Sequence, residues 1–313
     1  MIASKLIFGS EFKAHLQKIN FVCFSNNNKF LASASNDKAI KVWQLKQGKL
    51  DNAVFLKSNC ANSIAFSRDD RVLVSGEEDE KIKIWSLQTG ELIHTLIGHR
   101  QAVNSVAIHP NGKLIASASD DKTIKLWSLK SGKQVCTLTG HIDNVIAASF
   151  SPNGNVLASS GDINDKTVKL WFLSENRNIT LKGHSDWFGG IDSIAFTADS
   201  KLIASGSKDK TIKIWQVDTG KELMTFKGHD DHITSIAISP KNKLLASASK
   251  DKTLKLWTLT TGKLISEIDL KEEIRTVAFS PDSQILATGC SKGKIRLFKP
   301  QSKSSNDLQQ LLS

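Results

Sequence analysis

The sequence predicts an all-β fold, a seven-bladed β-propeller with four-stranded antiparallel blades. The first observation is a terminal aromatic residue that returns at spacings of 42, 42, 44, 44, 42 and 41 residues. The second is the alternation of apolar and polar residues between these aromatics, interrupted by Gly and Asn-Gly turns, which is typical of short strands joined by hairpins. A single unit of this size cannot bury both of its faces, so neighbouring units must cover one another. The aromatic residues are Trp43, Trp85, Trp127, Trp171, Trp215, Trp257 and Phe298.

The third unit shows the expected elements in order. Gly98-His99 is followed by strand patterns at 103–108 and 114–119, with a Pro-Asn-Gly-Lys turn between them, then by Asp121 and a third strand that ends at Trp127. A fourth strand follows the aromatic residue in six of the units. These fourth strands are expected at 49–57, 91–97, 133–139, 177–182, 221–227 and 263–270.

The seventh unit has no fourth strand of its own. Phe298 is followed by Lys-Pro-Gln and a Ser-rich tail, whereas the strand-like residues 4–13 precede the first unit and belong to none. We expect residues 4–13 to complete the last blade, because an unpaired strand edge invites aggregation. The predicted organisation is one propeller domain over 1–299 and a polar C-terminal tail over 300–313.

The repeated motif resembles the WD-repeat β-propeller family. The Gly-His pair returns at 140–141, 183–184 and 228–229, with Ala14-His15 as a weaker first copy, although no unit has the Trp-Asp ending of the family. The resemblance implies a non-enzymatic scaffold or sensor that binds a protein or peptide on the face carrying the Gly-His loops. The tail residues 307–312, Asp-Leu-Gln-Gln-Leu-Leu, are similar to tails that follow propellers in bacterial signalling ATPases. This second likeness implies a bacterial-type protein and an alternative role as the detached sensor arm of a signalling ATPase or kinase.

Serine, histidine and aspartate recur in five units, the residue types of a hydrolase triad. Five copies favour a structural role, because catalysis needs one activated nucleophile whereas every blade needs the same internal bonds. The resemblance implies a buried relay from tryptophan through serine and histidine to aspartate. In the second unit Lys57 takes the register of histidine, and the seventh unit keeps only the hydroxyl of Thr288, so we expect the seventh blade to be the least tied. The relay residues are His15, Ser33, Asp37, Trp43; His99, Ser117, Asp121, Trp127; His141, Ser159, Asp165, Trp171; His184, Ser205, Asp209, Trp215; and His229, Ser247, Asp251, Trp257.

The family's usual contact positions, transferred to this sequence, predict a partner-binding face that is rich in Asn and carries charges of both signs. Lys18 also occupies one of these positions. The fifth unit adds Trp187 and Phe188 on an extended loop before Gly189-Gly190. These two aromatics either anchor a partner or tuck back between blades. The other predicted contact residues are Asn20, Asn62, Asn104, Asn144, Asp192, Lys208, His232, Lys250 and Arg275.

Composition excludes some classes of protein. The 313 residues contain 40% hydrophobic and 23% charged residues, and no run approaches the ~18 apolar residues of a membrane span. The first ten residues do not form a signal peptide, so we expect a cytoplasmic protein. The four cysteines lack metal-site spacing, and we expect free thiols, no metal, no cofactor, no catalytic residues and a monomer.

The net charge of +11 is concentrated in the repeat. Basic residues fall on the turns at the end of the blades opposite the Gly-His loops, and this set is called the lysine rim. The lysine rim either provides solubility and edge protection or binds a polyanion. The absence of interleaved aromatic residues argues against nucleic acid as the partner. The lysine rim comprises Lys29, Arg71, Lys113, Lys201, Lys243, Lys49, Lys133, Lys221 and Lys263.

Overall fold

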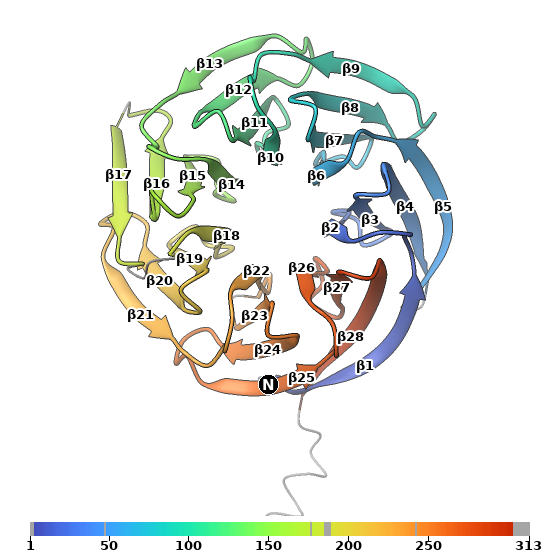
Figure 1. Ribbon diagram of the computed structural model, residues 1–313, viewed down its shortest axis with the longest axis vertical. Coiled ribbons are helices and arrows are strands. Elements are labelled where there is room, and N and C mark those ends of the chain that lie inside the picture. Colours follow the sequence, from blue (N-terminus) through green and yellow to red (C-terminus); the bar gives the residue numbers. More distant parts are fainter. Residues whose placement is uncertain (1–2, 47, 176, 185–188, 242, 303–313) are drawn as a thin grey trace, which may run out of the picture.

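The computed structural model describes residues 3–46, 48–175, 177–184, 189–241 and 243–302. These residues form seven four-stranded antiparallel sheets arranged as a ring around a central channel (Figure 1). The all-β, seven-bladed architecture predicted from the repeat is confirmed.

Each blade has four strands, ordered from the channel outward. The innermost strands are β2 (Ile19–Phe24), β6 (Ala61–Phe66), β10 (Val103–Ile108), β14 (Val145–Phe150), β18 (Ile191–Phe196), β22 (Ile233–Ile238) and β26 (Ile274–Phe279). The second strands are β3 (Phe30–Ser35), β7 (Val72–Glu77), β11 (Leu114–Ser119), β15 (Val156–Gly161), β19 (Leu202–Ser207), β23 (Leu244–Ser249) and β27 (Leu286–Cys290). The third strands are β4 (Ala39–Lys46), β8 (Ile82–Ser86), β12 (Ile124–Ser128), β16 (Thr167–Phe172), β20 (Ile212–Gln216), β24 (Thr253–Thr258) and β28 (Lys294–Ser302). The outermost strands are β5 (Lys49–Lys57), β9 (Leu92–Leu96), β13 (Gln134–Leu138), β17 (Arg177–Lys182), β21 (Glu222–Phe226), β25 (Leu264–Asp269) and β1 (Ala3–Lys13).

Blades 1 to 6 each use four consecutive strands, beginning with β2–β5, and blade 7 consists of β26, β27, β28 and β1. The N-terminal strand β1 pairs antiparallel with β28, for example through Phe12 and Ile295. Figure 1 shows the first and last strands side by side, β1 in blue against β28 in red. The predicted closure of the ring by residues 4–13 is therefore confirmed.

The hydrophobic core lies between blades. Between blades 2 and 3, Ile82 and Leu96 pack with Val103 and Trp127, and Trp127 is only 2% exposed. A side chain at Gly98 would place its Cβ 2.9 Å from Trp127 Cη2, which explains why glycine precedes histidine in this unit. The tryptophan spacing that defines the repeat is thus the spacing at which one blade covers the next.

Hydroxyl groups also join neighbouring blades along the channel wall. The third residue of an innermost strand accepts a hydrogen bond from a backbone N–H in the next blade, as Ser105 does from Ala148 at 3.1 Å. Phe21 and Ala147 hold the equivalent positions in blades 1 and 4 and have no hydroxyl group to offer. The same bond joins Thr276 to Val22, Ser63 to Val106, Ser193 to Ile236 and Ser235 to Val277.

Candidate functional site

The structure joins the four recurrent residues of five blades into a chain of polar contacts. In blade 3, Trp127 Nε1 donates to Ser117 Oγ at 2.8 Å, and this hydroxyl lies 2.7 Å from His99 Nε2. His99 Nδ1 lies 2.7 Å from Asp121 Oδ2. Equivalent hydrogen bonds link His15, Ser33, Asp37, Trp43; His184, Ser205, Asp209, Trp215; and His229, Ser247, Asp251, Trp257. In blade 4, Trp171, Ser159 and His141 are hydrogen-bonded, and His141 Nδ1 lies 3.1 Å from Asp165 Oδ2 without a hydrogen bond.

Burial sets the protonation of this relay. Desolvation lowers the pKa of His99 despite its contact with Asp121, so His99 is neutral at physiological pH. A neutral ring that donates from Nδ1 to Asp121 accepts the hydroxyl proton of Ser117 at Nε2, so every polar atom has a partner. Ser117 is 0% exposed, as are its four counterparts. These hydroxyl groups are closed to solvent and to a substrate. The five sets therefore resemble a hydrolase triad in residue type but not in accessibility.

Blade 2 replaces the missing histidine with a carboxylate. Lys57, at the register of histidine, is exposed, and Glu77 takes its place as the partner of Ser75. Ser75 Oγ donates to Glu77 Oε1 at 2.9 Å, while Lys83 Nζ lies 2.7 Å from Glu77 Oε2. Glu77 is 0% exposed, so the pair is a buried salt bridge. The sequence offered a signal for it, since Glu77 stands where other second strands end in serine, cysteine or glycine.

Blade 7 replaces the relay with charge pairs, and the expectation that it is the least tied blade was wrong. Arg296 Nη2 lies 2.7 Å from Glu272 Oε1, and both side chains are almost fully buried. Arg296 also pairs with Glu11 of β1, which in turn lies 2.6 Å from Lys294 Nζ. Glu11 therefore ties the closing strand β1 to β28, as Glu222 and Glu267 tie the outermost strands of blades 5 and 6 to their neighbours.

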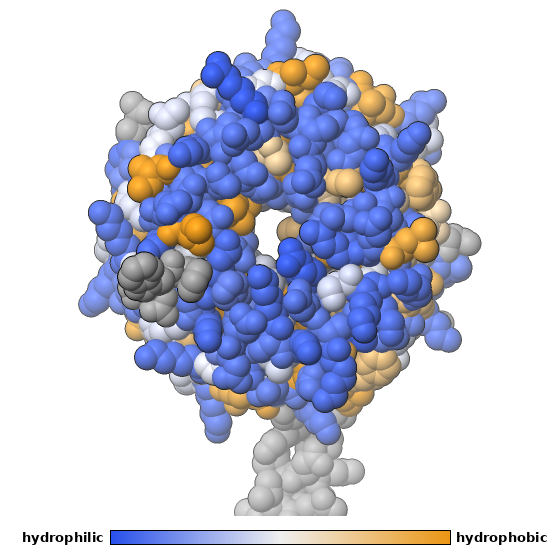
Figure 2. Space-filling model, in the orientation of Figure 1, coloured by the Kyte–Doolittle hydropathy of each residue, from blue (hydrophilic) through white to orange (hydrophobic). Residues whose placement is uncertain are grey.

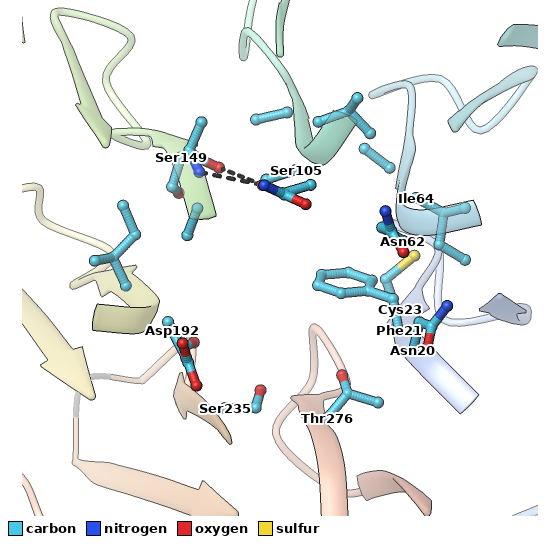
Figure 3. Close-up of a pocket in the computed structure, with 18 of the residues that line it drawn as sticks. Asn20, Phe21, Cys23, Asn62, Ile64, Ser105, Ser149, Asp192, Ser235 and Thr276 are labelled. Carbon is cyan, nitrogen blue, oxygen red and sulfur yellow. Dashed lines mark hydrogen bonds between the residues drawn. The ribbon is translucent and has the colours of Figure 1, made fainter. Parts of the chain in front are cut away.

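The central channel encloses a cavity of about 690 Å³ lined by residues of all seven blades. The face in Figure 2 is mostly hydrophilic around an open centre. Figure 3 shows Asn20, Phe21 and Asn62 on one side of the cavity and Asp192 on the other. Phe21 and Cys23, which the sequence did not single out, also form part of the wall. The predicted contact residues in the lining are Lys18, Asn20, Asn62, Asn104, Asp192, Lys208, Lys250 and Arg275; Asn144 and His232 are not part of it.

The asparagines of blades 1 to 3 use their amide groups to join blades. Asn20 Nδ2 donates to Asn36 Oδ1 and to the carbonyl of Ala61, which consumes both of its protons. Asn104 does the same with Asp120 Oδ1 and the carbonyl of Val145, while Asn62 donates to Val103. These bonds fix the amide planes, so the side-chain carbonyl oxygens remain as oriented acceptors.

A charged cluster occupies the opposite sector. Lys208 pairs with Asp162 and lies 3.5 Å from Asp192 Oδ1. Burial raises the pKa of Asp192 to about 6, although the positive charge of Lys208 opposes that shift. Asp162 directly follows β15 of blade 4 and reaches across to Lys208 of blade 5, a contact that sequence reasoning missed. Burial and the charge of Lys250 lower the pKa of the nearby His232.

Exposed apolar side chains stand on the loops around the histidines. Leu16 follows His15 and is 86% exposed, and Ile142 follows His141 and is 68% exposed. Ile97 precedes Gly98 and is 74% exposed. Trp187 and Phe188, the predicted anchors on the same face, lie outside the described residues.

The remaining sequence predictions concern metals, thiols and membranes. Within the described ranges, no group of three His, Cys, Asp or Glu side chains is arranged to hold a metal ion. Cys23, Cys60, Cys136 and Cys290 are unpaired. No helix in the same part of the chain has the length and apolar character needed to cross a membrane. All nine side chains of the lysine rim are exposed.

Comparison with known families supports this geometry. Residues 61–271, about two thirds of the chain, match the model described as the TEP-1 second beta-propeller. Residues 8–44 match the WD domain, G-beta repeat, and residues 238–308 match the WD40 domain of anaphase-promoting complex subunit 4. The chain belongs to the WD-repeat β-propeller family. Propellers of this family typically act as protein-interaction scaffolds and are usually non-catalytic.

Individual relatives share only short stretches with this WD-repeat propeller. The chain is 42% identical over 77 residues to nuclear distribution protein PAC1 of Fusarium vanettenii, which is 22% of this chain and 17% of that protein. It is 43% identical over 58 residues to eukaryotic translation initiation factor 3 subunit I of Debaryomyces hansenii, 18% of this chain and 16% of the relative. It is 36% identical over 66 residues to small ribosomal subunit protein RACK1 of Caenorhabditis elegans, 21% and 20% respectively. The matches therefore span about a fifth or less of each relative's length.

Proposed function

We propose that this chain is a non-enzymatic interaction module that binds a segment of a partner protein across the mouth of its channel. The binding face is the one that carries the Gly-His loops. The observation that carries this proposal is the cavity of about 690 Å³, to which every blade contributes side chains. Its mouth offers oriented carbonyl acceptors from Asn20, Asn62 and Asn104 beside a charged sector, and polypeptide backbones need such hydrogen-bond partners.

The exposed apolar residues on the same face support a protein partner. Leu16, Ile97 and Ile142 project from three different blades, and their burial against a partner would contribute to affinity. The relay hydroxyl groups are enclosed, which favours a structural role for them over a catalytic one. If Trp187 and Phe188 contact the partner, they extend this apolar set on the loop of blade 5.

Site-specific photo-cross-linking in cells tests this proposal. A benzophenone amino acid at position 142 reports on the Gly-His face, and the same group at position 113 reports on the lysine rim. Both positions are exposed in the free protein. We expect a defined polypeptide to be cross-linked from position 142 and not from position 113. Cross-linking from position 113 alone would contradict the proposed face.

Binding of a polyanion by the lysine rim is the second candidate, supported by nine exposed cationic side chains. Its signature is affinity that falls steeply between ~50 and ~200 mM salt. The rim is not uniformly cationic, because Asp69 lies 4.0 Å from Arg71. A role as the sensor arm of a bacterial signalling ATPase or kinase rests on residues 307–312, which lie outside the described residues.

A further inference from the structure

The charged side chains that line the channel cavity do not balance. Four are cationic, Lys18, Lys208, Lys250 and Arg275, and one is anionic, Asp192. Asp192 is already engaged by Lys208 at 3.5 Å. Arg275 acts on Asp192 only through a longer-range charge interaction. Among the described residues, Lys18, Lys250 and Arg275 form no direct ion pair. The cavity therefore keeps an excess of positive charge at its mouth.

The three unpaired cations come from consecutive blades around one opening. Lys18 immediately precedes β2 of blade 1, Lys250 lies in the turn between β23 and β24 of blade 6, and Arg275 is the second residue of β26 in blade 7. Charges of one sign around a narrow opening with protein walls focus their field and raise the local concentration of anions. Here they favour a compact anionic group that enters along the channel axis.

Peptide carboxylates fit this arrangement better than nucleic acid does. A phosphate backbone needs cations along a track and aromatic surfaces for its bases, whereas these cations lie together in one sector of the mouth. The amide oxygens of Asn20, Asn62 and Asn104 lie in blades 1 to 3 of the same mouth and can accept hydrogen bonds from peptide N–H groups. An acidic polypeptide presents both carboxylates for the cations and backbone N–H groups for the amide oxygens of the mouth.

We infer that the sector formed by Lys18, Lys250 and Arg275 binds an acidic segment of a partner polypeptide, whose Asp or Glu carboxylates enter the channel mouth. This inference rests on the proposed function and specifies the chemistry of its ligand. The bound carboxylates replace the ion-pair partners that these three side chains lack in the free protein.

The test measures fluorescence anisotropy of a labelled Gly-Ser peptide that contains four consecutive Asp residues, next to the same peptide with four Asn residues. We expect binding of the Asp peptide only. The double variant Lys250→Gln/Arg275→Gln should weaken that binding at least about tenfold, because both charges face the ligand. The matched control Lys113→Gln/Lys201→Gln removes the same charge from the lysine rim and should change affinity less than about twofold.

Thermal unfolding of both double variants shows whether each is folded. If the mouth variant is not folded, the single variants Lys18→Gln, Lys250→Gln and Arg275→Gln are measured in its place. Equal weakening by the mouth and rim variants would overturn the inference, as would tighter binding of a twelve-nucleotide oligo-dT through the same residues. If the Asp peptide does not bind while position 142 still cross-links a polypeptide, the acidic ligand is wrong and the proposed function stands. If both experiments fail, both proposals fall.

Discussion

The histidine of each relay connects a hydroxyl group on the second strand to an aspartate in the following turn. His99 connects a hydroxyl group on β11 to Asp121 in the following turn, and Asp121 Oδ2 also accepts the backbone N–H of Arg100 at 3.1 Å. Burial opposes ionisation of Asp121, yet hydrogen bonds from Thr123 and His99 outweigh it and lower its pKa. The relay therefore fixes the Gly-His loop and, with it, the face on which the proposed binding occurs.

Replacing His99 with Ala should lower the free energy of unfolding by about 1–3 kcal/mol, because Ser117 and Asp121 lose a buried partner. Lys57→Ala removes the residue at the same register in blade 2 and should have a much smaller effect, since Lys57 is exposed. Urea denaturation of both variants measures the difference. Equal losses would mean that the relay does not carry this stability.

Asp192→Asn should stabilise the protein at pH 7.5. The folded-state pKa of about 6 exceeds the ordinary value of 3.8, so the ionised carboxylate costs folding free energy above pH 6. The gain on substitution should reach at most about 3 kcal/mol, from 1.36 kcal/mol per pKa unit, and should disappear as the pH falls from about 6 to about 4.

Melting curves at pH 7.5 and pH 4 check this prediction, with Asp199→Asn as the control. A hydrogen bond from Thr197 lowers the pKa of Asp199, which is the opposite direction. Asp199→Asn should therefore give no stabilisation at pH 7.5. A gain for Asp192→Asn that is as large at pH 4 as at pH 7.5 would show that desolvation of its charge is not the cause.

At the scale of the blade, blades 2 and 7 contain a buried ion pair where the other five blades contain the histidine relay. Glu77 and Lys83 form the internal pair of blade 2, and Arg296 with Glu272 forms that of blade 7. Buried pairs cost desolvation on folding, but removal of one partner leaves a buried charge unpaired. In blades 2 and 7, replacement of either partner of the ion pair should therefore lower the free energy of unfolding.

Glu272→Ala should lower the free energy of unfolding by about 1–3 kcal/mol, because the buried Arg296 loses one of its two carboxylate partners and keeps only Glu11. Glu11→Ala removes the other carboxylate that contacts Arg296, but Glu11 is about one third exposed and should cost about 1 kcal/mol or less. Thermal unfolding of the two variants compares them directly. A larger loss for Glu11→Ala would reverse the roles assigned to the two carboxylates.

At the scale of the whole molecule, stability depends on closing the ring. Each core region is shared by two blades, and the seam between blades 7 and 1 is filled in the same way by Ala287 and Ile295 against Ile19 and Leu31. β1 supplies the outer strand of blade 7, so the last sheet is completed by pairing between residues near the start of the chain and residues near its end.

Deletion of residues 1–13 should expose the edge of β28 and cause aggregation or loss of a single cooperative unfolding transition. The physical reason is that the outer strand of blade 7 has no substitute in the chain. Size-exclusion chromatography and denaturant unfolding monitor the result. Deletion of residues 303–313 is the control and should leave both measurements unchanged. A monomeric, equally stable protein without residues 1–13 would contradict this requirement.

The sequence repeat by itself determines the architecture of this protein. The aromatic spacing gives the number of blades, the unassigned strand at residues 4–13 gives the closure, and the recurrence of His, Ser, Asp and Trp identifies the residues that the structure joins. These features are periodic, and periodicity is visible in the chain because each blade meets the same neighbours.

Only the tertiary structure decided how the departures from the repeat are accommodated. Glu77 pairs with Lys83 of β8, and Arg296 pairs with Glu272 in the turn before β26. Asp162 reaches Lys208 from the adjacent blade. Distances across the channel also decide that Lys18, Lys250 and Arg275 have no direct ion pair among the described residues. They decide as well that Asn20 and Asn104 donate their amide protons between blades. These contacts join residues that are far apart in sequence. Their positions around the channel depend on how all seven blades pack together.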